Sequence, residues 1–177
     1  MSDEPTIRPA TPADLPAIQK IYAHHVETGL ASFEEVPPDV DEMRRRFATL
    51  TDAGYPYLVA EADGQVLGYS YCGPYRPRPA YRYSVENSVY LAPEAARRGI
   101  GRRLLAALIE RATALGKRQM VAVIGDSANH ASIGLHTALG FRMVGKIEGA
   151  GFKHGRWVDS VLMQRQLGPG LSSPPSA

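Results

Sequence analysis

Cysteine is almost missing from this 177-residue sequence, because Cys72 is the single one. One cysteine excludes an intramolecular disulfide and a metal site built from a cysteine cluster, and it suits a reducing compartment. Apolar runs are short, since none approaches the roughly 20 residues that a membrane-spanning helix needs. The N-terminus, Met-Ser-Asp-Glu-Pro, is polar and acidic, which does not fit a secretory signal. We therefore expect a soluble, cytoplasmic protein without a membrane partner.

An excess of charge of one sign is also lacking. The chain has 20 Lys and Arg against 18 Asp and Glu, and a formal net charge of +2 does not favour a nucleic-acid partner. The hydrophobic share of 44% is ordinary for a globular protein, and the length fits one domain with a sizeable core. Gly, Ser and Pro dominate from Gly168 onward. These features predict one domain over residues 1–167 and a disordered tail over 168–177.

Hydrophobic spacing predicts alternating strands and helices along the domain. Strands are expected at Thr6–Pro9, Tyr57–Ala62, Val66–Cys72, Tyr83–Leu91, Gln119–Ile124, Phe141–Glu148 and Arg156–Gln166. Helices are expected after Thr11, Asp39 and Gly99, and over Ala131–Leu139. The order is strand, two helices, three strands, helix, strand, helix and two strands. It predicts an α/β fold with a sheet of mixed direction.

The stretch Val89–Leu104 reads as a strand end, a tight loop with two glycines and the start of a long amphipathic helix. Four arginines surround that helix start: Arg97, Arg98, Arg102 and Arg103. A helix start carries partial positive charge, so four guanidiniums repel it and one another unless an anion lies among them. Free N–H groups on a Gly-rich turn at a helix start form a phosphate site. The alternative is a tight turn followed by a solvated basic face, which a short glycine motif does not exclude.

This loop, Ala96-Arg97-Arg98-Gly99-Ile100-Gly101, is similar to the phosphate-binding signature Gln/Arg-x-x-Gly-x-Gly/Ala of the GNAT superfamily of acetyl-CoA-dependent N-acyltransferases. The resemblance covers roughly Ile7 to Gln166. It implies a mixed, mostly antiparallel sheet of about seven strands with helices on both faces. It also implies a V-shaped splay between the fourth and fifth strands. Ala96 departs from the usual Gln or Arg, which removes one side-chain contact and leaves the backbone donors.

A narrower resemblance is to phosphinothricin and methionine sulfoximine N-acetyltransferases. The segments that carry it are Gly73-Pro-Tyr75, Ala80-Tyr81, Val85-Glu-Asn-Ser-Val-Tyr90, Val121-Ala-Val-Ile-Gly125, Leu135-His-Thr-Ala-Leu-Gly-Phe141 and Lys153-His-Gly-Arg-Trp157. The resemblance implies direct transfer of acetyl from acetyl-CoA to the amine of a small L-amino acid-like acceptor, with no metal. Two alternatives stay open. One is a GNAT enzyme for another small amine or a protein N-terminus, and the other is a non-catalytic acyl-CoA-binding module, which only Ala96 favours.

Glu86 holds the position of this group's catalytic base, three residues before the Val-Tyr pair. A protonated amine must lose a proton before it attacks a thioester, and a carboxylate can take that proton directly or through water. Apolar neighbours in the strand indicate burial, which raises the pKa of a carboxyl group toward that of a useful base. The alternative is a strand carboxylate paired with Arg78 or Arg82.

The short helix carries His136 where many superfamily members have a tyrosine. Histidine can donate a proton to the leaving CoA thiolate near neutral pH, so His136 is a candidate general acid. Packing at the edge of the core is an alternative of equal weight. Asn129, at the start of the same helix, could hydrogen-bond the pantetheine arm, cap the helix or do both.

The resemblance also implies a set of binding residues. Contacts to acetyl-CoA are expected from Val89, Tyr90, Leu91, Arg97, Arg98, Gly99, Ile100, Gly101, Arg102 and Asn129. Contacts to the acceptor are expected from Phe33, Arg76, Arg78, Tyr81, Val123, Lys153 and His154. Guanidiniums suit an acceptor that carries acidic groups, although a proline-rich surface loop with solvated arginines is the alternative. In similar enzymes the last hairpin reaches a neighbouring subunit's active site, so a homodimer is expected.

Overall fold

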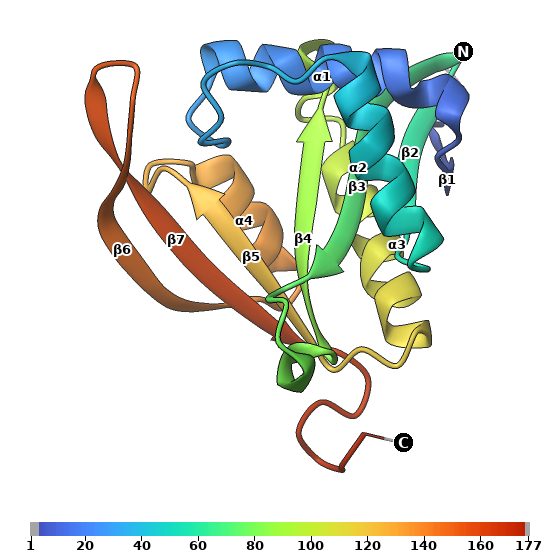
Figure 1. Ribbon diagram of the computed structural model, residues 1–177, viewed down its shortest axis with the longest axis vertical. Helices are drawn as coiled ribbons and strands as arrows, with labels where there is room; N and C mark the ends of the chain where they lie inside the picture. The colour runs from blue at the N-terminus through green and yellow to red at the C-terminus, as the bar shows by residue number, and fades with distance from the viewer. Residues whose placement is uncertain (1–3, 176–177) are drawn as a thin grey trace.

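A seven-stranded sheet with helices on both faces forms the body of the computed structural model, which describes residues 4–175 (Figure 1). The strands are β1 (Thr6–Pro9), β2 (Tyr57–Ala62), β3 (Gln65–Pro74), β4 (Ser84–Leu91), β5 (Gln119–Gly125), β6 (Arg142–Lys153) and β7 (Arg156–Gln166). The helices are α1 (Leu15–Thr28), α2 (Val40–Asp52), α3 (Ile100–Ala114) and α4 (His130–Ala138). Three short 3₁₀ turns are η1 (Pro12–Asp14), η2 (Pro79–Tyr81) and η3 (Pro93–Ala95).

The strand order is β1-β2-β3-β4-β5-β7-β6, with β4 and β5 parallel and the other neighbouring strands antiparallel. This confirms the mixed, mostly antiparallel sheet. The register of β4 and β5 runs from Ser84 opposite Gln119 to Asn87 opposite Ala122. Within the described residues the two strands share no later register pair, and they diverge toward their ends (Figure 1). The expected splay therefore begins after Asn87.

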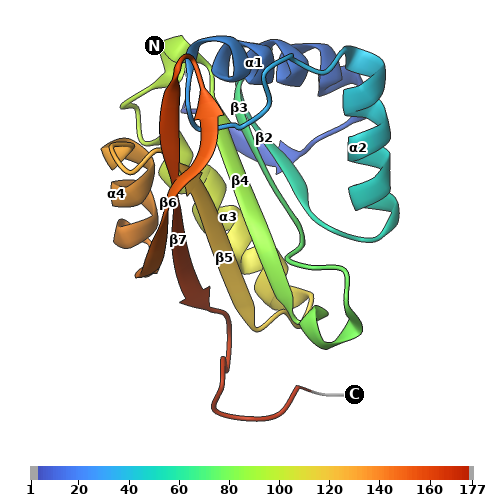
Figure 2. The same cartoon turned by 60° about the vertical axis from the view of Figure 1, so that its left-hand side comes forward.

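Side-chain alternation separates the two faces of the sheet. Tyr69 and Tyr71 of β3 stack with Tyr57 of β2, whose ring contacts Phe47 of α2. Ser70 points the other way, and its hydroxyl donates to a backbone carbonyl of α3. One face is thus covered by α1 and α2, and the opposite face by α3 and α4 (Figure 2).

The same alternation assigns the side chains of β4. Tyr90 lies opposite Tyr69 in the register and contacts Tyr22 of α1, so Glu86, Ser88 and Tyr90 share the α1/α2 face. Asn87 lies between them and points to the α3/α4 face. Tyr90 therefore faces away from its strand neighbours Val89 and Leu91.

β6 is longer than the sequence predicted. The glycines after Glu148 indicated a loop, but the strand continues to Lys153 because two register shifts absorb extra residues. One of them contains Gly149, whose φ is +57° and whose N–H donates to the Asp159 carboxylate at 3.0 Å. Glycine adopts this left-handed conformation without strain, so the glycines here serve a bulge and not a loop.

The chain beyond β7 returns to the start of β5. The Arg118 guanidinium donates to the carbonyls of Gly170 and Pro174, and the Leu171 N–H donates to the Gln166 side chain. Residues 176–177 lie outside the described part, and the expected disorder of the tail stays a prediction. Among residues 4–175, no helix combines the length and apolar character needed to cross a bilayer.

Candidate active site

The candidate phosphate loop, Ala96–Gly101, begins after the end of β4 and the short turn η3. Arg97 and the helix cap Gly99 have left-handed backbones, with φ of +62° and +75°. The first hydrogen bond back to the cap is donated by the Arg103 N–H, at 3.2 Å. Since the first N–H groups of a helix have no intrahelical acceptor, the backbone of Ile100 and Gly101 offers donors at this end. Such a turn fits a phosphate group.

The four arginines of this loop are not equivalent. The Arg103 guanidinium forms an ion pair with Glu4 at 2.9 Å, which sequence reasoning missed because the two residues are far apart in the chain. Arg97, Arg98 and Arg102 are exposed at the helix start. Three exposed guanidiniums beside free N–H donors form a basic surface that suits an anion.

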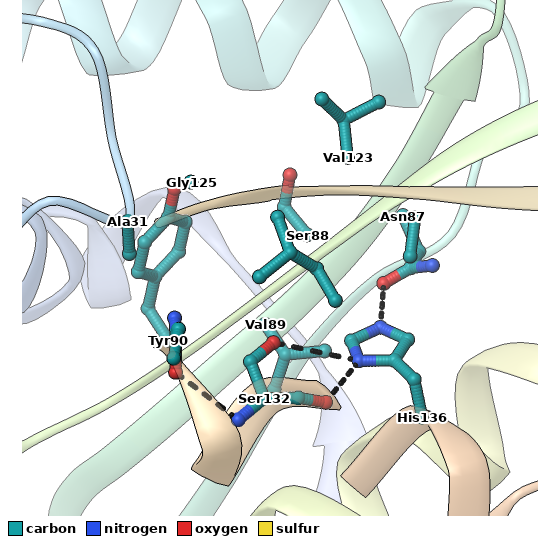
Figure 3. A pocket seen from close by; sticks show the side chains of 12 residues that line it. Ala31, Asn87, Ser88, Val89, Tyr90, Val123, Gly125, Ser132 and His136 are labelled. Carbon is teal, nitrogen blue, oxygen red and sulfur yellow. Dashed lines mark hydrogen bonds between the residues drawn. The ribbon is translucent and has the colours of Figure 1, made fainter. Parts of the chain in front are cut away.

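A cavity lies between β4 and β5 where the strands have separated (Figure 3). Its lining residues are Ala31, Asn87, Ser88, Val89, Tyr90, Ala122, Val123, Ile124, Gly125, Asn129, Ser132 and His136. Five of the residues predicted from the sequence meet here, and they come from β4, β5 and α4: Val89, Tyr90, Val123, Asn129 and His136. Because β5 no longer pairs with β4 here, the β4 backbone can bind an extended ligand like an added strand.

His136 is held in place by its neighbours and is only 3% exposed. Its Nε2 lies 3.0 Å from Oδ1 of Asn87, and its Nδ1 lies 2.8 Å from the Ser132 carbonyl. The Phe141 ring meets the imidazole edge to face. Burial lowers the pKa of His136. These contacts support the packing alternative, and the general-acid role stays a prediction.

Asn129 caps α4, since its side chain accepts a hydrogen bond from the Ser132 N–H at 3.2 Å. It also lines the cavity, so capping and ligand binding are compatible here.

Glu86 lies on the α1/α2 face, opposite to His136. It is half-buried, and burial raises the pKa of its carboxyl group, although the nearby Arg76 guanidinium opposes this. Of the two arginines proposed as alternative partners, Arg82 instead donates to the Pro79 carbonyl and lies over the Tyr83 ring. A carboxylate with a raised pKa is a better base near neutral pH.

The loop after β3 lies beside Glu86, because Gly73 is opposite Glu86 in the register. Arg76 stacks on the Tyr75 ring, which contacts Tyr81 edge to face at 5.7 Å. Arg76 and Arg78 are exposed. The structure therefore places a basic, aromatic loop next to the candidate base.

The remaining predicted acceptor contacts form a separate group. Phe33 lies on Gly151, where an added Cβ would come within 2.8 Å of its ring. Lys153 is 3% exposed and donates to the Ser32 carbonyl at 2.8 Å, which ties the Phe33 loop to the β6–β7 hairpin. Burial lowers the pKa of Lys153. His154 is exposed at the hairpin turn with φ of +49°.

Asn87 is the buried residue of the site that sequence reasoning missed. A signal was present, because this polar side chain is predicted to face inward between two valines, Val85 and Val89, on one face of the strand. A buried amide must be hydrogen-bonded, so such a position indicates a specific partner.

Known proteins resemble nearly the whole chain. The profile of the Acetyltransferase (GNAT) domain family matches residues 7–162. The chain is 57% identical over 170 residues to a phosphinothricin N-acetyltransferase from Alcaligenes faecalis, covering 96% of this chain and 86% of that protein. It is 46% identical over 170 residues to an L-methionine sulfoximine/L-methionine sulfone acetyltransferase from Pseudomonas aeruginosa, covering 96% and 98%.

A solved structure agrees with these relatives. A GNAT superfamily phosphinothricin acetyltransferase from Sinorhizobium meliloti, in complex with AcCoA, superposes with a TM-score of 0.94 at 51% identity. The match covers 97% of this chain and 93% of that chain.

The chain therefore belongs to the GNAT acetyltransferase family, as its loop motif and splayed sheet indicated. It is an acetyl-CoA-dependent N-acetyltransferase. The residues fit that co-substrate, because the basic loop offers donors for phosphate groups and β4 no longer pairs with β5 beyond Asn87. Within residues 4–175, no group of three or more His, Cys, Asp and Glu side chains is placed to hold a metal ion.

Proposed function

We propose that this enzyme acetylates the amine of a small L-amino acid-like acceptor of the phosphinothricin or methionine sulfoximine type. The observation that carries the proposal is that the charge of Arg76 acts on the half-buried carboxyl group of Glu86 on the α1/α2 face. A half-buried carboxylate can take the ammonium proton, and a neighbouring guanidinium can hold an acidic group of the same molecule. The acceptors in the names of the two relatives belong to this class.

The chain's own residues then have distinct tasks. Acetyl-CoA supplies an acetyl group activated as a thioester. The loop from Arg97 to Arg102 holds its phosphates, and the backbone of Val89–Leu91 with Asn129 binds the pantetheine arm. Glu86 accepts the ammonium proton, directly or through water, so that the neutral amine attacks. A backbone N–H of β4 beyond Asn87 donates to the oxygen on which negative charge develops. The carbon–sulfur bond then breaks as the amide forms. The departing CoA thiolate takes up a proton, for which His136 is the candidate donor, and the new amide nitrogen loses one.

Binding of the two substrates on opposite faces of the sheet favours direct transfer of the acetyl group. Glu86 faces α1 and α2, whereas Asn129 caps α4, which packs against the opposite face (Figure 2). Acceptor and acetyl-CoA would meet through the opening between the strands. Cys72 is fully buried and burial raises the pKa of its thiol to about 12, so this group is a poor nucleophile for an acyl-enzyme route.

A panel of acceptors tests the proposed substrate class by release of free CoA thiol. We expect kcat/KM for phosphinothricin or methionine sulfoximine to exceed that for an amine without a carboxylate by about 100-fold, since a charge-assisted contact to Arg76 is lost. The panel includes ordinary amino acids and a peptide with a free N-terminus. A peptide acceptor with the highest kcat/KM would overturn the proposal in favour of a protein N-terminus. Tight acetyl-CoA binding without thiol release on any acceptor would favour the binding module.

We further propose that the enzyme is a homodimer that works in the cytoplasm. β6 is one of the two edge strands of the sheet, and it carries the exposed apolar side chains Met143, Val144 and Ile147. Phe152 and Trp157, the latter 68% exposed, contact each other at the hairpin end. An edge strand with such a patch favours pairing with a second copy. The single buried cysteine suits a reducing compartment.

The double variant Ile147→Glu, Trp157→Ala tests the dimer. Sedimentation should show a dimer for the wild-type chain and a dissociation constant at least about 10-fold higher for the variant, because a buried charge and a lost aromatic anchor each oppose association. Leu115→Glu, at an equally apolar exposed position after α3, is the control and should leave the dimer intact. A wild-type monomer at all concentrations would contradict the proposal.

A further inference from the structure

The loop that joins α1 to α2 carries Phe33 and extends toward the β6–β7 hairpin (Figure 2). On its way it packs on the end of β5, where an added Cβ at Gly125 would meet backbone oxygens of the loop. Ala31 of this loop and Gly125 both line the cavity, at the end away from His136 (Figure 3). The loop therefore closes one end of the site.

This end of the cavity lies on the acceptor side of the sheet. Val121 of β5 is opposite Glu86 of β4 in the register, so both side chains face α1 and α2. Strict alternation along β5 places Val123 and Gly125 on the same face as Val121. An acceptor bound beside Glu86 therefore lies on the face that the Phe33 loop crosses.

Two glycines make room for the Phe33 ring. A Cβ added at Gly151 of β6 would lie 2.8 Å from Cδ2 and from Cε2, which form one edge of the ring. A Cβ added at Gly125 would lie 3.1 Å from Cε1, on the opposite edge. Neither glycine has a positive φ, so these two positions use the missing side chain and not the freedom of the backbone.

Hydrogen bonds hold the loop on both sides of the ring. The Ser32 carbonyl accepts from Nζ of the buried Lys153 at 2.8 Å. The Glu34 carboxylate accepts from the Tyr22 hydroxyl at 2.5 Å and from the Arg46 guanidinium at 2.7 Å. These contacts fix the loop to α1, α2 and the hairpin. A ring that is pushed from its place must therefore turn about its own side-chain bonds.

We propose that Gly151 and Gly125 are positioning residues that seat Phe33 at the acceptor end of the cavity, and that the seated ring sets the longest acceptor side chain the enzyme takes. A methyl group at Gly151 drives the ring toward Gly125, and so toward the cavity. Phosphinothricin and methionine sulfoximine both end in a methyl group, which suits an apolar wall. The inference rests on the proposed function, because it assigns the ring to the side chain of that acceptor.

Gly151→Ala tests the seat with two acceptors that differ by one methylene group. L-Methionine sulfone and the shorter S-methyl-L-cysteine sulfone carry the same functional groups, and thiol release measures kcat/KM for each. We expect the ratio of kcat/KM, longer over shorter, to fall about 10-fold, the scale of one methylene group in an apolar pocket. The amount of folded enzyme cancels in this ratio, so a merely structural loss would not move it.

A smaller side chain in place of Phe33 supplies both a rescue and an independent variant. In Gly151→Ala, Phe33→Leu we expect the ratio to return to within about 3-fold of the wild type, because the two changed residues are in contact and compensate in volume. Phe33→Leu alone leaves more room. It should raise kcat/KM for the homologue one methylene longer than methionine sulfone, relative to methionine sulfone, by about 10-fold.

Gly134→Ala is the matched control. Gly134 is exposed in α4 and has no positive φ, and among residues 4–175 no atom beyond its own helix and chain neighbours lies within 4 Å of an added Cβ. The same chemical change there should leave all the ratios at their wild-type values.

An unchanged ratio in a folded Gly151→Ala would overturn the proposal, and so would a double variant that shows no recovery. If Gly151→Ala does not fold, an unchanged preference for acceptor length in Phe33→Leu overturns it. The proposed function fails on a different result, which the wild type alone gives: thiol release with a peptide or a simple amine and with none of the sulfones. That result removes both proposals, whereas an unchanged ratio removes only the role of the two glycines.

Discussion

Glu86→Gln should lower kcat for acetyl transfer by about 100- to 1,000-fold at neutral pH, because an amide cannot take the proton of the acceptor ammonium group. The Gln side chain has almost the same shape, so we expect acetyl-CoA affinity and the free energy of unfolding to stay near their wild-type values. Thiol release measures the rate, and calorimetry measures the affinity. Glu110→Gln, in α3 and exposed, is the control with the same chemical change and should keep the full rate.

The pH dependence gives this prediction a second readout. Burial raises the pKa of Glu86, and the base must be deprotonated to act, so kcat/KM should increase with pH through that raised pKa and then level. Glu86→Gln should lack this acidic limb. Since the Arg76 charge lowers the pKa of Glu86, Arg76→Gln should move the limb to higher pH. A wild-type limb that persists in Glu86→Gln would assign the base to another group.

The order of the elements could be predicted because each one has a clear period or boundary in the sequence. α3 is an example, since its fully buried residues Leu104, Leu105 and Leu108 repeat at helical spacing after Gly99. β6 could not be predicted to its end. Its continuation past Gly149 depends on an N–H bond to Asp159 across the hairpin, which is a tertiary contact that local composition does not reveal.

In the candidate site, too, one part could be predicted from the sequence and another could not. The candidate phosphate loop is a local motif, so its residues could be proposed from their spacing. The partner of His136 lies 49 residues away in β4, and the acceptor for Lys153 lies 121 residues away in the Phe33 loop. The family resemblance gave these residues candidate roles, but only the fold gives them neighbours. Through these neighbours, His136 and Lys153 each contact a carbonyl oxygen of the protein. These contacts limit the hydrogen bonds that either side chain can still offer to a substrate.

The phosphate loop supplies the second large expected effect. The double variant Arg97→Gln, Arg98→Gln should raise the dissociation constant of acetyl-CoA by about 10- to 100-fold, since two exposed guanidiniums beside a helix start each contribute a charge-assisted contact to phosphate. The affinity should also become less sensitive to salt, because fewer charges act on the ligand. Calorimetric titration at two ionic strengths measures both quantities.

The control for this variant carries the same change of charge elsewhere. Arg44 and Arg45 are exposed on α2 and form ion pairs with Asp41 and Glu42 of the same helix, so Arg44→Gln, Arg45→Gln removes two charges far from the loop. It should leave acetyl-CoA affinity within about 2-fold of the wild type, because exposed pairs on a helix contribute little. Equal losses in the two double variants would mean that net charge attracts the ligand. A loss confined to the Arg97 and Arg98 variant would place the phosphates at the start of α3. The backbone N–H groups of Ile100 and Gly101 can donate to them there, and these donors do not depend on the side chain at position 96.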